Sequence, residues 1–341
     1  MLHYVFYKGV PVGGAMAGST LLLTREKRNA LRVVTLTINN RCNLKCGHCY
    51  LQYSPTDETP VRSLISEEIA THVLSGRFEH LTIVGKEPLA DTQSIQRLSE
   101  IVLQSQQRGI GVSLITNGLN GALLPSETVR ALSWIDVSLD GGPESYSAYR
   151  GGSWSKLRNA INSLHASGLR ELRVLNTLSH RNLPYIDDMI NGAQLLRASR
   201  TIFSPFQRTL SDGVQTETPV SFEEFARALR DAATSPEAYC IVDAGYLKSA
   251  PAAAAWLQQL QHDFESRLIL TDFDPIELGI LRVTYDGLVM TPQESIDTQK
   301  YPANAHNLLE KPIDDWYSDM LSSSKLKMPV RPRSYEIRPS H

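Results

Sequence analysis

Three cysteines close together in the chain are the residues whose types and spacing stand out. Cys42, Cys46 and Cys49 follow the spacing C-x3-C-x2-C, whereas the fourth cysteine, Cys240, lies far along the 341-residue chain. Three thiols this close cannot all form disulfides, and the regular spacing indicates a metal site. A structural zinc site usually takes four protein ligands, but three thiolates on a cubane cluster leave one iron open to bind a substrate or cofactor. The spacing therefore favours a reactive iron–sulfur cluster, and the alternatives are a zinc loop completed by His48 or three unrelated buried thiols.

The elements that must position these cysteines form a repeating pattern between residues 32 and 204. Short apolar segments predict six strands, at residues 32–38, 80–84, 111–115, 134–139, 171–175 and 200–204. Helical periodicity lies between them, at residues 66–76, 92–108, 125–132, 155–167 and 182–196. Repeated β-α units imply a parallel sheet covered by helices, either open or closed into a barrel.

Polar residues follow the predicted strands at the points where the strands end. These positions are Arg41-Cys42, Gly85 to Pro88, Thr116-Asn117-Gly118, Asp140 to Gly142, and Asn176. In parallel α/β folds, ligands bind at the carboxyl ends of the strands. The cysteine cluster and the other polar strand ends are therefore expected to form one site.

The pattern changes after about residue 210. Residues 222–233 and 252–264 predict helices, residues 278–290 a hairpin with an Asp286-Gly287 turn, and residues 312–321 a final helix. We therefore expect four parts: an N-terminal hairpin or cap (1–30), a β-α barrel (31–210), a C-terminal extension (211–325) and a tail (326–341).

Composition limits the class of protein. Apolar residues make up 42% and charged residues 21%, which excludes a largely disordered chain. The sequence has 34 Lys and Arg and 36 Asp and Glu. Because basic residues are not in excess, the composition does not predict a nucleic-acid partner. No apolar run approaches the roughly 18 residues that a membrane span needs, and the first residues do not read as a secretory signal. We expect a cytoplasmic protein without a membrane partner.

Over residues 33–210 the sequence resembles the radical S-adenosylmethionine (SAM) superfamily. The resemblance implies an α/β fold, a partial (β/α)6 barrel with a smaller C-terminal α+β extension. It implies that Cys42, Cys46 and Cys49 hold one [4Fe-4S] cluster whose open iron binds SAM. One electron, from a donor such as flavodoxin or ferredoxin, would cleave SAM to a 5'-deoxyadenosyl radical that abstracts a substrate hydrogen. No further catalytic residue is predicted.

The same resemblance assigns SAM contacts to particular residues. His48 takes the position beside the adenine, and Gly85-Lys86-Glu87-Pro88 is similar to the Gly-Gly-Glu-Pro segment that binds the SAM amino group. The chain departs from that segment at Lys86, and lysine serves there unless the position needs a positive φ. The remaining strand-end residues, assigned to the ribose hydroxyls, the SAM carboxylate or the substrate, are Asn117, Ser138, Asp140 and Asn176. Arg150 resembles an arginine that neutralises the SAM carboxylate.

The C-terminal residues 281–320 resemble the end of a SPASM or twitch extension. The similarity rests on the Asp286-Gly287 hairpin, on Pro292, on His306-Asn307-Leu308 and on Trp316. Gln293 stands where cysteine is usual, and no cysteine follows Cys240. The extension is thus expected to lack auxiliary clusters, and Cys240 is expected to pack as a small hydrophobe.

Three functions are compatible with these residues. The first is modification of a ribosomally made peptide in natural-product biosynthesis. The second is a redox-neutral dehydration, epimerisation or decarboxylation of a sugar or nucleoside. The third is a non-catalytic zinc or binding protein, which the intact cysteine triad and Glu87 argue against.

Overall fold

The computed structural model describes residues 32–49, 64–206, 217–229 apart from 222 and 226, 240–243, 268–271, 280–290 and 306–325. The predicted N-terminal cap, the helix at 252–264, Pro292, Gln293 and the tail lie outside these residues, as does the side-chain environment of Cys240.

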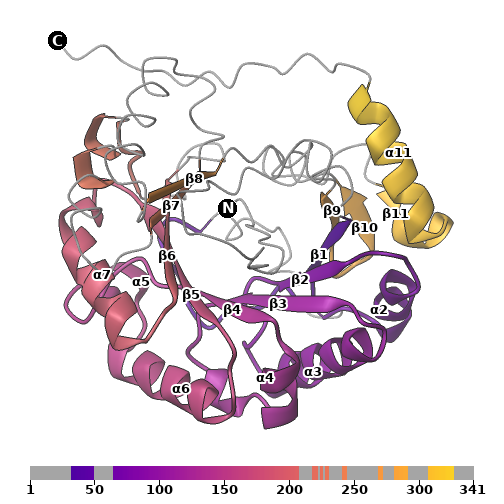
Figure 1. Ribbon diagram of the computed structural model, residues 1–341, viewed down its shortest axis with the longest axis horizontal. Coiled ribbons are helices and arrows are strands. Elements are labelled where there is room, and N and C mark those ends of the chain that lie inside the picture. The colour runs from indigo at the N-terminus through magenta and orange to yellow at the C-terminus, as the bar shows by residue number, and fades with distance from the viewer. Residues whose placement is uncertain are drawn as a thin grey trace, which may run out of the picture.

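One curved sheet of eleven strands organises the described residues, with helices on its outer side (Figure 1). Its middle is a run of six parallel neighbours: β1 (Val33–Thr37), β2 (His80–Val84), β3 (Gly111–Thr116), β4 (Trp134–Ser138), β5 (Leu172–Leu178) and β6 (Arg200–Pro205). The sheet is not closed. The predicted α/β class, the parallel sheet and the six strands are therefore confirmed, with bounds that differ by a few residues.

The sheet extends beyond the six expected strands on both sides. After β6 come the parallel strands β7 (Cys240–Asp243) and β8 (Leu268–Thr271). On the other side β9 (Ile280–Val283) pairs parallel with β1, followed by antiparallel β10 (Leu288–Met290) and β11 (His306–Asn307). β9 joins this sheet because its Leu281 and Val283 bury in the same core as the outward side chains of β1. The predicted hairpin turn forms, with Gly287 at φ 82°.

The helices cover the outer face of the sheet. They are α2 (Glu67–Leu74), α3 (Thr92–Gln107), α4 (Ser126–Ala131), α5 (Tyr146–Arg150), α6 (Trp154–Ala166), α7 (Ile186–Leu195) and α11 (Ile313–Lys325), with 3-10 turns η3 (Gly121–Leu123), η4 (Leu183–Tyr185) and η6 (Leu308–Glu310). Ser66, Asp91 and Ser153 cap the N-termini of α2, α3 and α6 by accepting backbone N–H bonds. The short helix α5 was not predicted.

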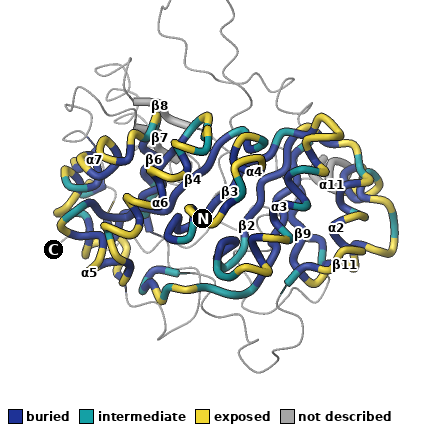
Figure 2. The backbone as a smooth tube through the Cα atoms, turned by 90° about the horizontal axis from the view of Figure 1, so that it is seen from below, coloured by how far each residue is buried: buried dark blue, intermediate teal, exposed yellow. Residues whose placement is uncertain are grey.

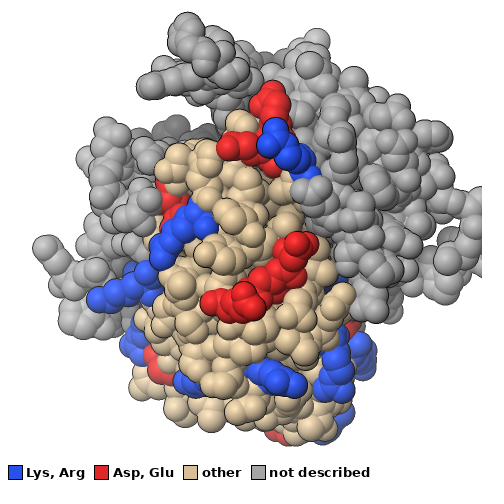
Figure 3. All heavy atoms as spheres, turned by 90° about the vertical axis from the view of Figure 1, so that its left-hand side faces the viewer, with Lys and Arg blue, Asp and Glu red and all other residues tan. Residues whose placement is uncertain are grey.

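The polarity of the strand side chains alternates with the strand period of two, although both faces of β1, β2 and β4 are buried. Outward residues such as Leu36, Leu81 and Ile135 pack in one hydrophobic cluster against the helices. The tube in Figure 2 accordingly shows buried strands, with exposed residues concentrated on the surrounding helices and turns. The face shown in Figure 3 carries scattered acidic and basic side chains, some of them side by side, on a largely uncharged surface. Within the described residues, no helix is both long and apolar enough to cross a bilayer.

The inner face of the sheet is polar although it is buried. Register pairs Thr35 with Thr82, Thr82 with Ser113, and Asp136 with Arg173, and each of these side chains is buried. Buried polar atoms ordinarily have hydrogen-bond partners. The curved sheet therefore surrounds a polar interior rather than an apolar one.

Candidate functional site

The cysteine loop begins directly after β1 and is held by the neighbouring strand end. Asn39, just beyond β1, donates through Nδ2 to the Glu87 carbonyl (2.8 Å) and to Ser94 Oγ (2.9 Å), while its carbonyl accepts from Lys86 N (3.1 Å). The chain therefore enters the loop from a fixed point at the carboxyl ends of β1 and β2.

Within the loop, backbone groups orient the cysteines. Leu44 N–H donates to Cys42 Sγ (3.3 Å), and Cys49 N–H donates to the Cys46 carbonyl (3.2 Å). Cys46 is buried, whereas Cys42 and Cys49 are partly exposed. All three are free of disulfides, as their spacing predicted.

The chemistry of the three thiols fits a cationic cluster. Burial is the main cause that raises the pKa of Cys42 to about 12; the Leu44 N–H bond opposes the rise, and the neighbouring Glu87, Cys49 and Cys46 contribute to it. Burial also raises the pKa of Cys46, although the Arg150 guanidinium opposes it. Cys42 and Cys46, whose burial opposes ionisation, need a strongly positive partner to become thiolates, and iron would supply that charge. Within the described residues, no three His, Cys, Asp or Glu side chains are grouped as one shared metal ion would require.

Glu87 is the buried carboxylate at the end of β2. Its Oε1 accepts from Leu89 N (2.8 Å) and Thr116 Oγ1 (2.5 Å), and its Oε2 accepts from Asn117 N (2.6 Å). Burial raises the pKa of Glu87, while these three donors favour the ionised form. Glu87 thus ties the end of β2 to the end of β3 and keeps acceptor capacity for a further donor.

The Gly85-Lys86 pair shows why lysine is tolerated in this segment. A Cβ on Gly85 would lie 2.5 Å from Asn39 Oδ1, so a side chain there would displace Asn39. Lys86 is not among the residues with positive φ. Its backbone carbonyl is therefore presented as glycine would present it.

Asn117 joins the third strand end to the cysteine loop. Its Nδ2 donates to Asn43 Oδ1 (2.6 Å), and its Oδ1 accepts from Leu119 N (3.0 Å). The predicted residues of three strand ends, at Cys42 to Cys49, Gly85 to Glu87, and Asn117, are thus brought together.

Ser138 and Asn176 are buried on the neighbouring strands β4 and β5. Asn176 Oδ1 accepts from Asp140 N (3.1 Å), but among the described residues the buried Asn176 Nδ2 has no hydrogen-bond partner. Such a donor is ordinarily satisfied. It fits a bound group that offers an oxygen at this position.

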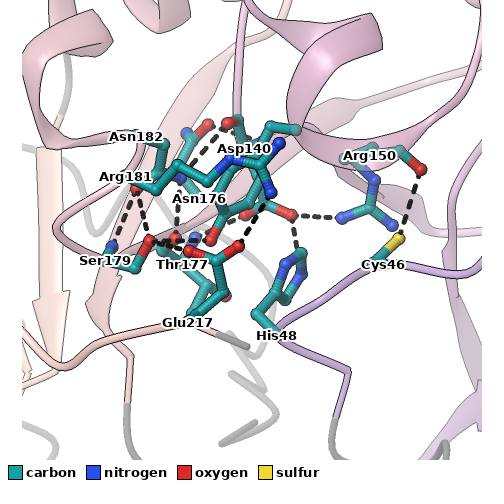
Figure 4. A network of polar contacts seen from close by, with 11 residues as sticks. Cys46, His48, Asp140, Arg150, Asn176, Thr177, Ser179, Arg181, Asn182 and Glu217 are labelled. Atoms are coloured by element: carbon teal, nitrogen blue, oxygen red, sulfur yellow. Dashed lines mark hydrogen bonds and ion pairs between the residues drawn. The ribbon is translucent and has the colours of Figure 1, made fainter. Parts of the chain in front are cut away.

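Asp140 turns back into the protein, as Figure 4 shows. It has a left-handed backbone (φ 54°), which Asp tolerates better than most residues. Its Oδ2 accepts from Arg150 Nη1 and lies 3.2 Å from His48 Nε2, and its Oδ1 accepts from Thr177 N (2.5 Å). Burial alone would raise the pKa of Asp140, but His48 and Arg150 together hold it below the usual range. His48 Nε2 therefore faces Asp140.

Arg150 connects this carboxylate to the cysteine loop. Its carbonyl lies 3.6 Å from Cys46 Sγ, and its buried guanidinium bonds Asp140. Burial disfavours its charge, but Cys46 and Asp140 raise the pKa of Arg150 overall. The guanidinium therefore stays cationic beside Cys46.

Several site residues were not predicted from the sequence. Tyr149 stacks on His48 with ring centroids 5.0 Å apart, and its hydroxyl lies 3.1 Å from Ser179 Oγ. Glu217 and Arg181 complete this group around Ser179. The position of Tyr149 directly before Arg150 could have indicated it in the sequence. Glu217 lies beyond the predicted barrel, and no sequence pattern indicated it.

Residues 36–190 match the family model of the Radical SAM superfamily. The chain carries a radical SAM domain. Proteins of this superfamily use a [4Fe-4S] cluster and SAM, and the sequence resemblance to radical SAM proteins is thereby confirmed.

Two curated relatives match about half of the chain. The sporulation killing factor maturation protein SkfB of Bacillus subtilis is 27% identical over 184 residues, 49% of this chain and 42% of that protein. The Fe-coproporphyrin III synthase of Methanosarcina barkeri is 26% identical over 175 residues, 48% of this chain and 42% of that protein. The match thus spans less than half the length of either relative.

A solved structure shares the fold over most of the chain. Streptococcus suis SuiB bound to its precursor peptide SuiA superposes with a TM-score of 0.62 and 13% identity, covering 89% of this chain and 69% of that chain. The fold of SuiB is therefore shared over most of this chain, beyond the residues that match the family model.

Proposed function

We propose that this protein is a radical SAM enzyme that modifies a ribosomally made peptide in natural-product biosynthesis. The observation that carries the proposal is the C-x3-C-x2-C loop fastened, inside a radical SAM domain, to Glu87 through Asn39 and to Asn117 through Asn43. When bound, the cluster and SAM supply the one-electron chemistry that starts hydrogen abstraction from a substrate.

Different residues of the chain hold the cluster and bind SAM. Cys42, Cys46 and Cys49 hold one cluster, because the sequence has a single cysteine triad. The Glu87 carboxylate and the backbone carbonyls of Gly85 and Lys86 bind the SAM amino group.

The other strand ends surround the rest of SAM. Asn117, Ser138 and Asn176 offer hydrogen bonds, and the free Asn176 Nδ2 suits an oxygen of SAM. His48 lies beside the adenine. Asp140, whose carboxylate is occupied by protein groups, acts by holding His48 and Arg150, and Arg150 places positive charge where the SAM carboxylate and the cluster thiolates are negative.

Two observations favour a peptide substrate. SkfB is named a maturation protein for a killing factor, and SuiB is bound to a precursor peptide.

A small-molecule substrate is the second candidate. The similarity to Fe-coproporphyrin III synthase, named for a tetrapyrrole product, favours it. A redox-neutral conversion would also suit a chain whose cysteines are too few for an auxiliary cluster.

Two further assignments belong to this proposal. An external one-electron donor of the flavodoxin or ferredoxin type reduces the cluster, because reductive cleavage of SAM would consume one electron that the cluster must receive from outside the protein. The location is cytoplasmic, where thiols remain reduced.

The substrate class is tested by supplying the reconstituted, reduced enzyme and SAM with short peptides encoded beside its gene. A mass change in one peptide, absent with Cys46→Ala, is the expected result. Turnover of a sugar, nucleoside or tetrapyrrole, with every such peptide left unchanged, would replace the peptide by the second candidate.

A further inference from the structure

Glu217 is a buried carboxylate that no part of the proposed chemistry uses. Its side chain is 2% exposed, although it belongs to a short segment that follows the expected barrel. That segment docks on the loop after β5, where Ser179 and Pro219 form an antiparallel bridge and His180 N donates to the Thr218 carbonyl (3.1 Å).

Two side chains of the β5 loop bind the Glu217 carboxylate. Ser179 Oγ donates to Oε2 (2.9 Å), and Arg181 Nη1 donates to Oε1 (3.2 Å). Because a carboxylate only accepts, the single Ser179 hydroxyl proton points at Glu217. The Ser179 oxygen is then left to accept from the Tyr149 hydroxyl, which lies 3.1 Å away.

Tyr149 links the hydrogen bonds of Glu217 and Ser179 to the cysteine loop. Burial, with Asp140 and Glu217 nearby, raises the pKa of Tyr149, so its hydroxyl keeps the proton it donates. The Tyr149 ring stacks on His48 at an interplanar angle of 14°. His48 lies between Cys46 and Cys49 in the chain, and Figure 4 shows Glu217, Ser179 and His48 within one group.

We propose that Glu217 is a positioning residue that, through Ser179 and Tyr149, fixes His48 and the loop of Cys42 to Cys49 for SAM binding. Docking of the segment at residues 217–220 is thereby coupled to the cofactor site. The expected effect on SAM binding rests on the proposed function, whereas the expected ordering of the cysteine loop does not.

Glu217→Gln is the sharpest test because it keeps the shape of the side chain. Arg181, a donor, holds the amide oxygen, so the amide NH2 faces Ser179 and reverses its hydrogen bond. The Ser179 proton is then no longer held by residue 217 and can turn to the Tyr149 oxygen or to Asn182 Oδ1, 3.5 Å away, so the fixed direction of the Tyr149 hydrogen bond is lost. The matched control is Glu224→Gln, since Glu224 also joins this segment to the β5 loop, at 3.4 Å from His180, but does not contact Ser179 or Tyr149.

Two measurements on the reconstituted full-length protein separate positioning from general stability. Hydrogen exchange followed by mass spectrometry should show faster exchange in a peptide covering residues 42–49 for Glu217→Gln, and unchanged exchange for Glu224→Gln. Anaerobic calorimetry should show roughly two- to tenfold weaker SAM binding for Glu217→Gln, the range expected for one hydrogen bond. Tyr149→Phe should reproduce both effects, and the double variant should add little to either single variant.

Wild-type exchange and affinity in Glu217→Gln would overturn the inference. So would equal effects of Glu217→Gln and Glu224→Gln, or additive effects of Glu217→Gln and Tyr149→Phe. If the wild-type protein bound no SAM, the proposed function would fail, while the exchange comparison would still decide the role of Glu217.

Discussion

Asp140 and Arg150, ten residues apart, form a buried ion pair that lies between His48 and Cys46. Each partner compensates a charge that would otherwise be isolated from water. Because Arg150 also contacts Cys46 through its carbonyl, this pair connects the end of β4 to the cysteine loop.

Removing one partner of this pair should be costly. Asp140→Asn keeps a residue that tolerates the left-handed backbone but leaves Arg150 uncompensated, so a loss of about 3–5 kcal/mol in unfolding free energy is expected at pH 7. The folded-state pKa of Asp140 is lowered, so its stabilisation is present above the unfolded value near 4 and is lost below it. Urea unfolding at several pH values should therefore show that the difference in unfolding free energy between the wild-type protein and Asp140→Asn narrows only below about pH 4. If this difference in unfolding free energy were already absent at pH 6, the ion pair between Asp140 and Arg150 would be contradicted.

Asp136 should show the opposite pH dependence. Burial raises its pKa to about 6, so the folded protein binds a proton that the unfolded chain releases near pH 4. The wild-type protein should lose up to about 3 kcal/mol as pH rises from 4 to 6, whereas Asp136→Asn, which cannot ionise, should not. The amide oxygen still accepts from Trp134 Nε1, a bond of 2.9 Å in the wild type. A difference between the two proteins that stays constant with pH would remove Asp136 from this account.

Glu87→Gln should reduce both stability and SAM affinity. Thr116 Oγ1 and Asn117 N donate to different carboxylate oxygens, and Gln keeps only one accepting oxygen, so one buried donor faces the amide NH2 and loses its partner at a cost of about 1–3 kcal/mol. The lost charge should weaken SAM binding by roughly ten- to a hundredfold. Thermal unfolding and anaerobic calorimetry measure the two effects separately. If Glu87→Gln were less stable but bound SAM with unchanged affinity, Glu87 would have only a structural role, connecting β2 to β3.

Lys86→Gly tests whether only the backbone matters at this position. Glycine adds freedom to the unfolded chain, so a loss of about 0.4–1 kcal/mol in stability is expected. SAM affinity should stay the same, because Lys86 already lacks a positive φ. Tighter binding would show instead that the Lys86 ammonium competes with SAM for Glu87. Unchanged SAM cleavage with less product would place Lys86 against the substrate.

The sequence predicted the parts of this site that depend on local pattern. Strand period and strand-end polarity located Cys42, Glu87 and Asn117 because β-α units place successive strand ends together. The pairing of Asp140 with Arg150 was not predicted, because it requires the left-handed turn at Asp140 and the short helix α5.

Residues brought in from distant segments were also not predicted. Glu217 reaches Ser179 across 38 positions of the chain through a segment that shows no β-α pattern. The strand β9 joined the sheet beside β1 for a similar reason, since its apolar residues bury in a core that the sequence had assigned to the barrel alone. Such docking depends on tertiary packing, which periodicity does not report.

The central claim is that Cys42, Cys46 and Cys49 hold one cluster that cleaves SAM. The direct measurement is 5'-deoxyadenosine, quantified by mass spectrometry after anaerobic reconstitution and reduction, with iron counted in the same sample. We predict about four iron atoms per chain and 5'-deoxyadenosine formation that Cys46→Ala abolishes and Cys240→Ala retains. A fully loaded, reduced wild-type protein that forms no 5'-deoxyadenosine, or a protein that binds one zinc ion and no iron, would contradict the claim.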